Sequence, residues 1–237
     1  MQVPGPITTD LLLEGSYPFS CHVLGNAYIC LAINFGAGSL LKWFRDNLAY
    51  EEKLQASERN IDIYRLFDEM AAGSECPLFI YPYFEGAQTP FNNPQAKGIM
   101  MGFNLGTKKE DIIGGIMEGI TLELKLNIER LEKSGIKIDS LNASGGGSRS
   151  SYWLQLKADI TGKIIRSLNI VEAGCLAGAV IAGYGIGKYN SIEDAISSIV
   201  KFRKEYHPSK EKTGYYEKRF RLYEKIFPLV SEHIKEM

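Results

Sequence analysis

The feature that most constrains this chain is a run of three glycines, Gly145, Gly146 and Gly147, in the segment LNASGGGSRSSYW at 141–153. Glycine loses more backbone freedom on folding than any other residue, so three in succession indicate a place that requires bare backbone. A short apolar run precedes them, and a serine-rich helix start follows. A strand, a glycine turn and a helix N-terminus together leave outward-pointing N–H groups that can bind an anion such as phosphate.

The residues themselves leave two interpretations of this loop open. Either the glycines let a phosphate reach the backbone, or they form only a tight turn before a helix capped by Ser150 or Ser151. The loop matches neither G-x-x-x-x-G-K-[ST] nor G-x-G-x-x-G. A second cluster, GYGIGKY at 183–189, follows a helical pattern rather than a strand, and we expect it to form a C-terminal helix turn.

Around the loop, strand patterns alternate with helix patterns, which favours an α/β fold. Strands are predicted at 136–143, at 163–168, within ECPLFIYPYF (75–84), and among turns in the first 36 residues. Apolar spacing predicts helices near 38–48, 60–72, 107–133, 150–161, 172–184 and 191–199, and a late helix that Pro228 interrupts. Thr107 and Glu110 have the spacing of a capping box for the 107–133 helix.

Charge and composition exclude several classes of function. The formal net charge is -1 and the basic residues form no block, which argues against a nucleic acid or an anionic membrane as partner. Neither an apolar run of membrane-spanning length nor a signal-peptide pattern is present.

The cysteines and histidines predict neither a metal site nor a catalytic triad. The cysteines lack C-x-x-C spacing, which favours reduced thiols in the cytoplasm. The histidines lie outside any metal or triad motif. These residues are Cys21, Cys30, Cys76 and Cys175, and His22, His207 and His233.

Four segments carry a family resemblance. SGGGSRSSYWLQLKADITGKII (144–165) resembles the C-terminal signature of the FGGY carbohydrate kinases, GGGxxSxxWxQxxADxxGxPV. PYFEGAQTPFNNPQAKG (82–98) and the helix after it are similar to the family's PY-x-x-G-x-x-TP region, and EAGCLAGAVIAGY (172–184) is similar to its E-x-x-x-x-GA-x-x-A helix. NFGAGSLLKWFRDNL (34–48) resembles the helix that opens the nucleotide side. The likeness spans roughly 30–237 and keeps the family's order.

This resemblance implies an α/β fold of the ribonuclease-H-like, actin-like ATPase type, with a mixed sheet flanked by helices. Residues 1–237 would form the nucleotide-side, C-terminal domain of an ATP- and Mg²⁺-dependent kinase. The N-terminal domain, with the sugar contacts and the aspartate base, has no counterpart in this sequence, so no catalytic residue is expected. The intact enzyme would phosphorylate a sugar or polyol hydroxyl, with xylulose as the first expectation, and this chain alone would be inactive.

The resemblance also implies a nucleotide-binding set. Gly146 would offer its backbone to the α-phosphate, Gly145 and Gly147 would keep the approach open, and Ser150 would lie at the nucleotide edge. Gly38 and Lys42 would lie near the phosphates, although Lys42 could instead be a solvated helix charge.

Three residues near the glycine run are not assigned to the nucleotide-binding set. Asp159 and Trp153 are expected to be structural. Arg149 is expected to be solvent-exposed by default, and it could contact a phosphate if the loop closes.

Two other classes of function remain in view. The chain could be a non-catalytic binding or assembly module that keeps the kinase fold. An actin-type activator of a radical enzyme would require cluster-binding cysteines, and the four cysteines are not so arranged. The sequence leaves the oligomeric state open, with a homodimer as one option.

Overall fold

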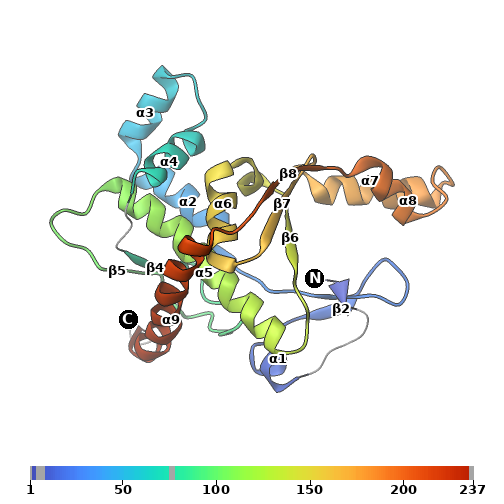
Figure 1. The fold of residues 1–237 in the computed structure, drawn as a ribbon, viewed down its shortest axis with the longest axis horizontal. Helices are drawn as coiled ribbons and strands as arrows, with labels where there is room; N and C mark the ends of the chain where they lie inside the picture. Colours follow the sequence, from blue (N-terminus) through green and yellow to red (C-terminus); the bar gives the residue numbers. More distant parts are fainter. Residues whose placement is uncertain (1, 4–8, 75–77, 235–237) are drawn as a thin grey trace.

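A computed structural model describes residues 2–3, 9–74 and 78–234 of the chain (Figure 1). One long helix, α5 (Lys109–Lys133), runs through the middle of the fold, and the other elements pack around it. Most of its side chains are buried, because partners cover it on several sides. Those partners are helices α2 (Gly36–Asn47), α4 (Ile63–Ala72), α6 (Ser151–Thr161) and α9 (Lys210–Ile234), and strand β4 (Phe79–Tyr81).

In the part of the chain that the structure describes, the strands form three small sheets rather than one continuous sheet. The sheet next to the glycine loop is mixed, with β6 parallel to β7 and β7 antiparallel to β8. The other two sheets are antiparallel, in the orders β1-β3-β2 and β4-β5. The bounds are β1 (Gln2–Val3), β2 (Phe19–Cys21), β3 (Tyr28–Cys30), β5 (Ile99–Met101), β6 (Ser140–Ala143), β7 (Ile164–Leu168) and β8 (Phe202–Tyr206).

The main core lies between α5 and strand β4. Gly119 allows this close approach, because a Cβ atom on it would lie 1.9 Å from the carbonyl oxygen of Ile80. Beyond the strand, the Tyr81 ring stacks on Tyr223 of α9 at 4.2 Å between ring centroids. Phe227 continues the same aromatic cluster. Helices α2, α4 and α6 also pack on α5, and α6 contacts α9 as well.

Helices α7 (Ala173–Gly185) and α8 (Ile192–Ile199) form an arm that extends away from this core (Figure 1). They bury a small cluster of their own around Val180, Ile192 and Ala195. Much of α7 is apolar yet exposed, including Ile181 and Tyr184. The arm thus holds together mainly through contacts between its two helices.

The structure corrects the predicted start of α5. Thr107 and Glu110 do not form a capping box; instead the Asp111 carboxylate accepts from the Lys108 N–H at 2.9 Å. Thr107 belongs to a turn that precedes the helix, in which its Oγ1 accepts a hydrogen bond from the N–H of Asn104. The helix therefore begins at Lys109, because Thr107, which the sequence pattern assigned to the cap, forms part of the turn instead.

The predicted interruption at Pro228 is also wrong. Helix α9 continues from Lys210 to Ile234 with Pro228 inside it. Proline removes one helical hydrogen bond and usually bends or breaks a helix. Here Phe227, immediately before it, packs on Tyr83 and Phe91 with centroids 4.4 Å and 4.6 Å away. These buried aromatic contacts of Phe227 outweigh the tendency of Pro228 to break the helix.

Other predicted elements are confirmed with small changes of boundary. The helices α2, α4, α6, α7 and α8 and the strand β7 appear as expected, and Gly162 ends α6 in the left-handed conformation. Two short helices were missed: α1 (Asp10–Glu14), in the region expected to hold only strands and turns, and α3 (Tyr50–Glu58). Among the described residues, no helix is both long and apolar enough to cross a membrane.

Candidate functional site

The glycine run forms an open turn between β6 and α6. Gly145 has a φ of 79°, which side-chain-bearing residues rarely adopt, and its N–H donates to the Val171 carbonyl at 2.9 Å. The Ser148 hydroxyl and N–H both bond the Gly145 carbonyl, closing a short 3₁₀ helix, η1 (Gly146–Arg149). A Cβ on Gly146 would meet nothing within 4 Å, so the backbone there faces open space.

This turn borders a pocket of about 500 Å³. Helices α2 and α4 supply one side of it, and η1 with the start of α6 supplies the other. Its volume falls within the range of small-molecule sites. The lining residues are Gly38, Leu41, Asp62, Tyr64, Arg65, Asp68, Met117, Gly146, Gly147, Arg149, Ser150 and Trp153.

The pocket brings together four of the six residues predicted for nucleotide binding: Gly38, Gly146, Gly147 and Ser150. Gly145 contributes through the shape of the turn. Lys42 is an exposed residue of α2 and is not among the described residues that line the pocket. A lysine one turn into a helix does not necessarily point its side chain into the pocket.

The start of α2 is held by partly buried polar contacts. The Asn34 side-chain oxygen accepts from the Gly36 N–H at 2.8 Å, while its amide donates to the Glu123 carboxylate of α5. Burial raises the pKa of Glu123 well above its ordinary value. These contacts tie the first turn of α2, including Gly38, to the central helix.

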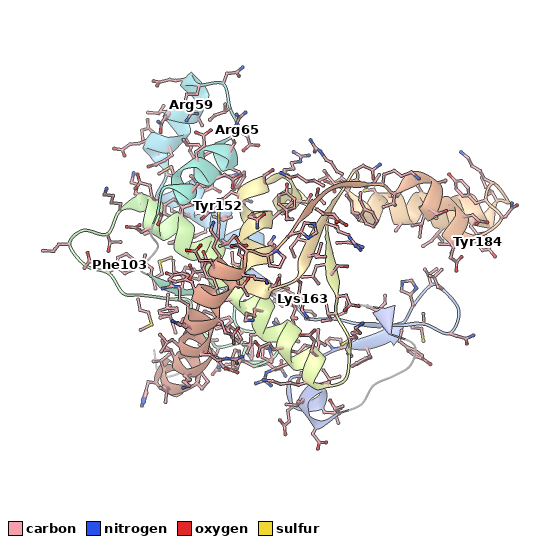
Figure 2. All side chains as sticks on the ribbon, viewed as in Figure 1. Arg59, Arg65, Phe103, Tyr152, Lys163 and Tyr184 are labelled. Carbon is pink, nitrogen blue, oxygen red and sulfur yellow. The ribbon has the colours of Figure 1, made fainter. Side chains whose placement is uncertain are left out.

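Ser150 links the glycine turn to α4. Its Oγ accepts from the N–H of Trp153, which caps α6 as predicted, and donates to Oδ1 of Asp68 at 2.6 Å. Burial raises the pKa of Asp68, and the bond from Ser150 partly offsets this rise. Nearby, Tyr152 donates to the carbonyl of Ala71 at 3.0 Å, and Figure 2 shows Tyr152 between the two helices.

Trp153 is part of the core and also part of the pocket. It is 6% exposed, and its indole N–H donates to the Met117 carbonyl and to Thr121 Oγ1. The Lys157 ammonium lies 4.1 Å from the centre of its ring, and burial lowers the lysine pKa to about 8. Asp159 is buried away from the pocket and accepts from the Ser209 N–H, in agreement with a structural role.

Arg149 lies between the main pocket and a second hollow of about 150 Å³. It is exposed and lines both spaces. The smaller hollow is lined by Ser148, Arg149, Ser151, Ser167, Arg203, Lys204 and Tyr206.

Metal-binding chemistry finds no support in the described segments. Within them, no group of three or more His, Cys, Asp or Glu side chains is placed to hold a metal ion. Cys21, Cys30 and Cys175 are free thiols, and Cys76 lies outside the described residues.

The comparison with known families is decisive at this point. Residues 16–186 match the family model for the C-terminal domain of the FGGY family of carbohydrate kinases. The chain belongs to the FGGY family. Its fold is therefore that of the FGGY sugar kinases, the actin-like ATPase type expected from the sequence.

Individual FGGY proteins show how much of a kinase the chain represents. A xylulose kinase of Staphylococcus epidermidis is 29% identical over 206 residues, which cover 87% of this chain and 40% of the relative. The ligand-bound xylulose kinase of Lactobacillus acidophilus superposes with a TM-score of 0.80 at 22% identity, covering 97% of this chain and 44% of that one. The structure of Plasmodium falciparum glycerol kinase with ADP superposes with a TM-score of 0.67 at 19% identity, covering 84% of this chain and 38% of that one. The chain thus spans about two fifths of these proteins.

Several pocket residues were missed by sequence reasoning. Tyr64, Arg65 and Asp68 come from α4, and Asp62 is the residue that caps it; the sequence predicted this segment only as an amphipathic helix. The one local feature that could have indicated a pocket residue in this helix was Asp68, an acidic residue directly after the buried Phe67.

Proposed function

We propose that this chain is the nucleotide-binding half of an ATP-dependent sugar kinase. The observation that carries the proposal is the 500 Å³ pocket with bare Gly146 backbone at its rim. Leu41, Met117 and the Trp153 ring provide an apolar wall suited to a flat base. The open N–H groups around Gly146 suit the phosphates, because anions bind at such glycine turns before a helix.

In this proposal the chain binds and orients ATP, and it performs no proton transfer. Gly146 holds the α-phosphate, Gly145 and Gly147 leave room for it, and Gly38 borders the phosphates from α2. Lys42 acts at most from a distance, as a solvated charge near the phosphates. The Mg²⁺ that neutralises charge in phosphoryl transfer would come with the nucleotide, and no residue of this chain is assigned to it.

The acceptor hydroxyl and the base that deprotonates it belong to an N-terminal domain, as expected from the resemblance. The relatives' greater length leaves room for such a domain. We propose xylulose as the sugar, supported by the similarity to the S. epidermidis enzyme. Exposed free thiols at Cys21 and Cys175 favour a cytoplasmic location. A homodimer stays a prediction.

Nucleotide binding can be tested by calorimetry with ADP. Gly146→Val places a branched side chain where the phosphates would rest, so we expect ADP affinity to fall at least about tenfold. Gly25→Val is the matched control, because Gly25 also has open space around its Cβ position and lies outside the pocket lining. Equal ADP affinity of the two variants would contradict the proposal.

A sugar-panel assay separates this function from the alternative of a non-catalytic module. We expect the chain alone to give no turnover with ATP and xylulose, and to bind ADP. Absence of ADP binding would favour the assembly module, and turnover above background would contradict the missing base.

A further inference from the structure

The second hollow collects positive charge in a chain whose formal net charge is -1. It lies where η1 and the start of α6 meet strands β7 and β8 (Figure 1). Arg149, Arg203 and Lys204 line it, and no acidic residue is among the described residues of its lining. A hollow lined by charge of one sign concentrates ions of the opposite sign. We therefore expect the second hollow to attract anions.

A β-bulge brings two consecutive basic residues to this hollow. Lys204 pairs with Ser167 of β7. Two positions back along β8, Phe202 pairs with Leu168, which is only one position further along β7, so Arg203 is the extra residue of the bulge. Consecutive side chains of a regular strand point to opposite faces, whereas a bulge re-aims a side chain. The irregular register thus explains how both basic residues line the same hollow.

The two arginines of the second hollow are available to a ligand. Among the described residues, neither Arg149 nor Arg203 forms a hydrogen bond or an ion pair through its side chain, and both are exposed. The acid on the same strand, Glu205, is paired with Arg166 at 2.7 Å. A guanidinium group matches a phosphate group with two parallel N–H donors. Two guanidinium groups therefore border one hollow without a protein anion of their own.

Neutral donors complete the lining. Tyr206 is 5% exposed, and its hydroxyl donates to Ser151 Oγ at 3.0 Å. Among the described residues the Ser151 hydroxyl proton has no acceptor, so it can donate to a ligand. Ser151 also begins α6, and the N–H groups of a first helical turn favour a negative charge. The Lys204 ammonium lies 4.7 Å from the centre of the Tyr206 ring, which keeps this cation beside the two hydroxyls.

We propose that the second hollow is a binding site for a phosphate group, either the free ion or the phosphate of a small monoester. Arg149 and Arg203 bind its oxygens, and Lys204 adds a third positive charge. At about 150 Å³ the hollow is smaller than sites for whole small molecules, which suits one phosphate group rather than a nucleotide. Arg149 is the one described residue that lines both this hollow and the main pocket, so the inference stands apart from the proposed nucleotide site.

Thermal unfolding with inorganic phosphate at constant ionic strength tests the site. We expect phosphate to raise the Tm by about 3 °C at ten times its dissociation constant, and chloride to have no such effect. Arg203→Gln should weaken phosphate binding at least about tenfold. Lys218→Gln is the matched control, because it also removes one exposed positive charge but lies on α9, outside the lining of the hollow.

Gly146→Val separates this site from the glycine turn. It fills the turn at the main pocket, so phosphate affinity should stay within about twofold of the wild type. Loss of phosphate binding in Gly146→Val but not in Arg203→Gln would place the ion at the glycine turn and overturn the inference. Equal phosphate affinity of Arg203→Gln and Lys218→Gln, or no effect of phosphate on the wild type, would overturn it as well.

Ribose 5-phosphate distinguishes the two sources of the phosphate group. Binding tighter than that of inorganic phosphate assigns the site to a monoester, and weaker binding assigns it to the free ion. In both cases the affinity should fall in Arg203→Gln by the same factor as for inorganic phosphate. Unchanged ribose 5-phosphate affinity in this variant would contradict a shared phosphate site.

Discussion

At the scale of single residues, the site combines groups whose surroundings are unusual for their type. Gly146 presents bare backbone, Asp68 is a carboxylate among apolar side chains, and Lys157 is a cation stacked on Trp153. Each is tolerated because neighbours hold it in place: the turn closed by Ser148, the hydroxyl of Ser150, and the indole ring. We therefore expect substitutions of these residues to affect folding stability and ligand binding to different degrees.

Lys157 gives a prediction about pH. Burial lowers its pKa from 10.5 to about 8, so the folded chain releases this proton before the unfolded chain does. The unfolded state then binds more protons between these values, and the free energy of unfolding rises with pH across that window. Lys157→Met removes this rise, by about 1–3 kcal/mol. Urea denaturation at pH 7.5 and 10 measures it, and an identical pH slope for both proteins would contradict the assignment.

At the scale of elements, α6 is held at both ends and α5 is held close to β4. Ser150 caps the start of α6 and Gly162 ends it, while Tyr152 ties it to α4. Helix α5 lies close on β4 because its glycines face the strand. The distance between these two elements sets where Met117 and Trp153 meet the pocket.

Two glycines of α5 test this close packing. A Cβ on Gly119 would lie 1.9 Å from the Ile80 carbonyl oxygen, whereas one on Gly115 would lie 3.0 Å from the movable Cδ1 of Ile80. We expect Gly119→Ala to destabilise the chain by about 2–3 kcal/mol. Gly115→Ala should change stability by less than about 1 kcal/mol, because alanine also favours helix. Chemical denaturation of both variants checks this, and similar midpoints would show that α5 can shift away from β4.

At the scale of the whole molecule, the chain divides into a well-packed centre and the α7–α8 arm. The centre joins α2, α4, β4, α5, α6 and α9 in one hydrophobic cluster, and the arm has its own small cluster. Local opening is easier where few apolar contacts hold an element. The arm should therefore open independently of the centre.

Hydrogen exchange followed by mass spectrometry tests this division. We expect amide protons of α7 and α8 to exchange at least about tenfold faster than those in the middle of α5. Uniform protection across 173–199 and 109–133 would show that the arm is as stable as the centre.

The glycine turn, the Ser150 cap, the Gly162 stop and the order of helices and strands could all be predicted from the sequence. They depend on backbone conformation and on residues a few positions apart, which a linear pattern records. The same local rules were wrong at Thr107 and Pro228, where a competing turn and a buried aromatic contact prevailed.

Only the tertiary structure decided what the pocket contains. Asp68 meets Ser150 across 82 positions of sequence, and Lys42 lies outside the lining although its helix borders the pocket. The sequence by itself therefore determined the open glycine turn and the family. The neighbours of that turn depend on how α2, α4 and α6 pack on α5, since long-range packing brings together residues that local patterns cannot relate.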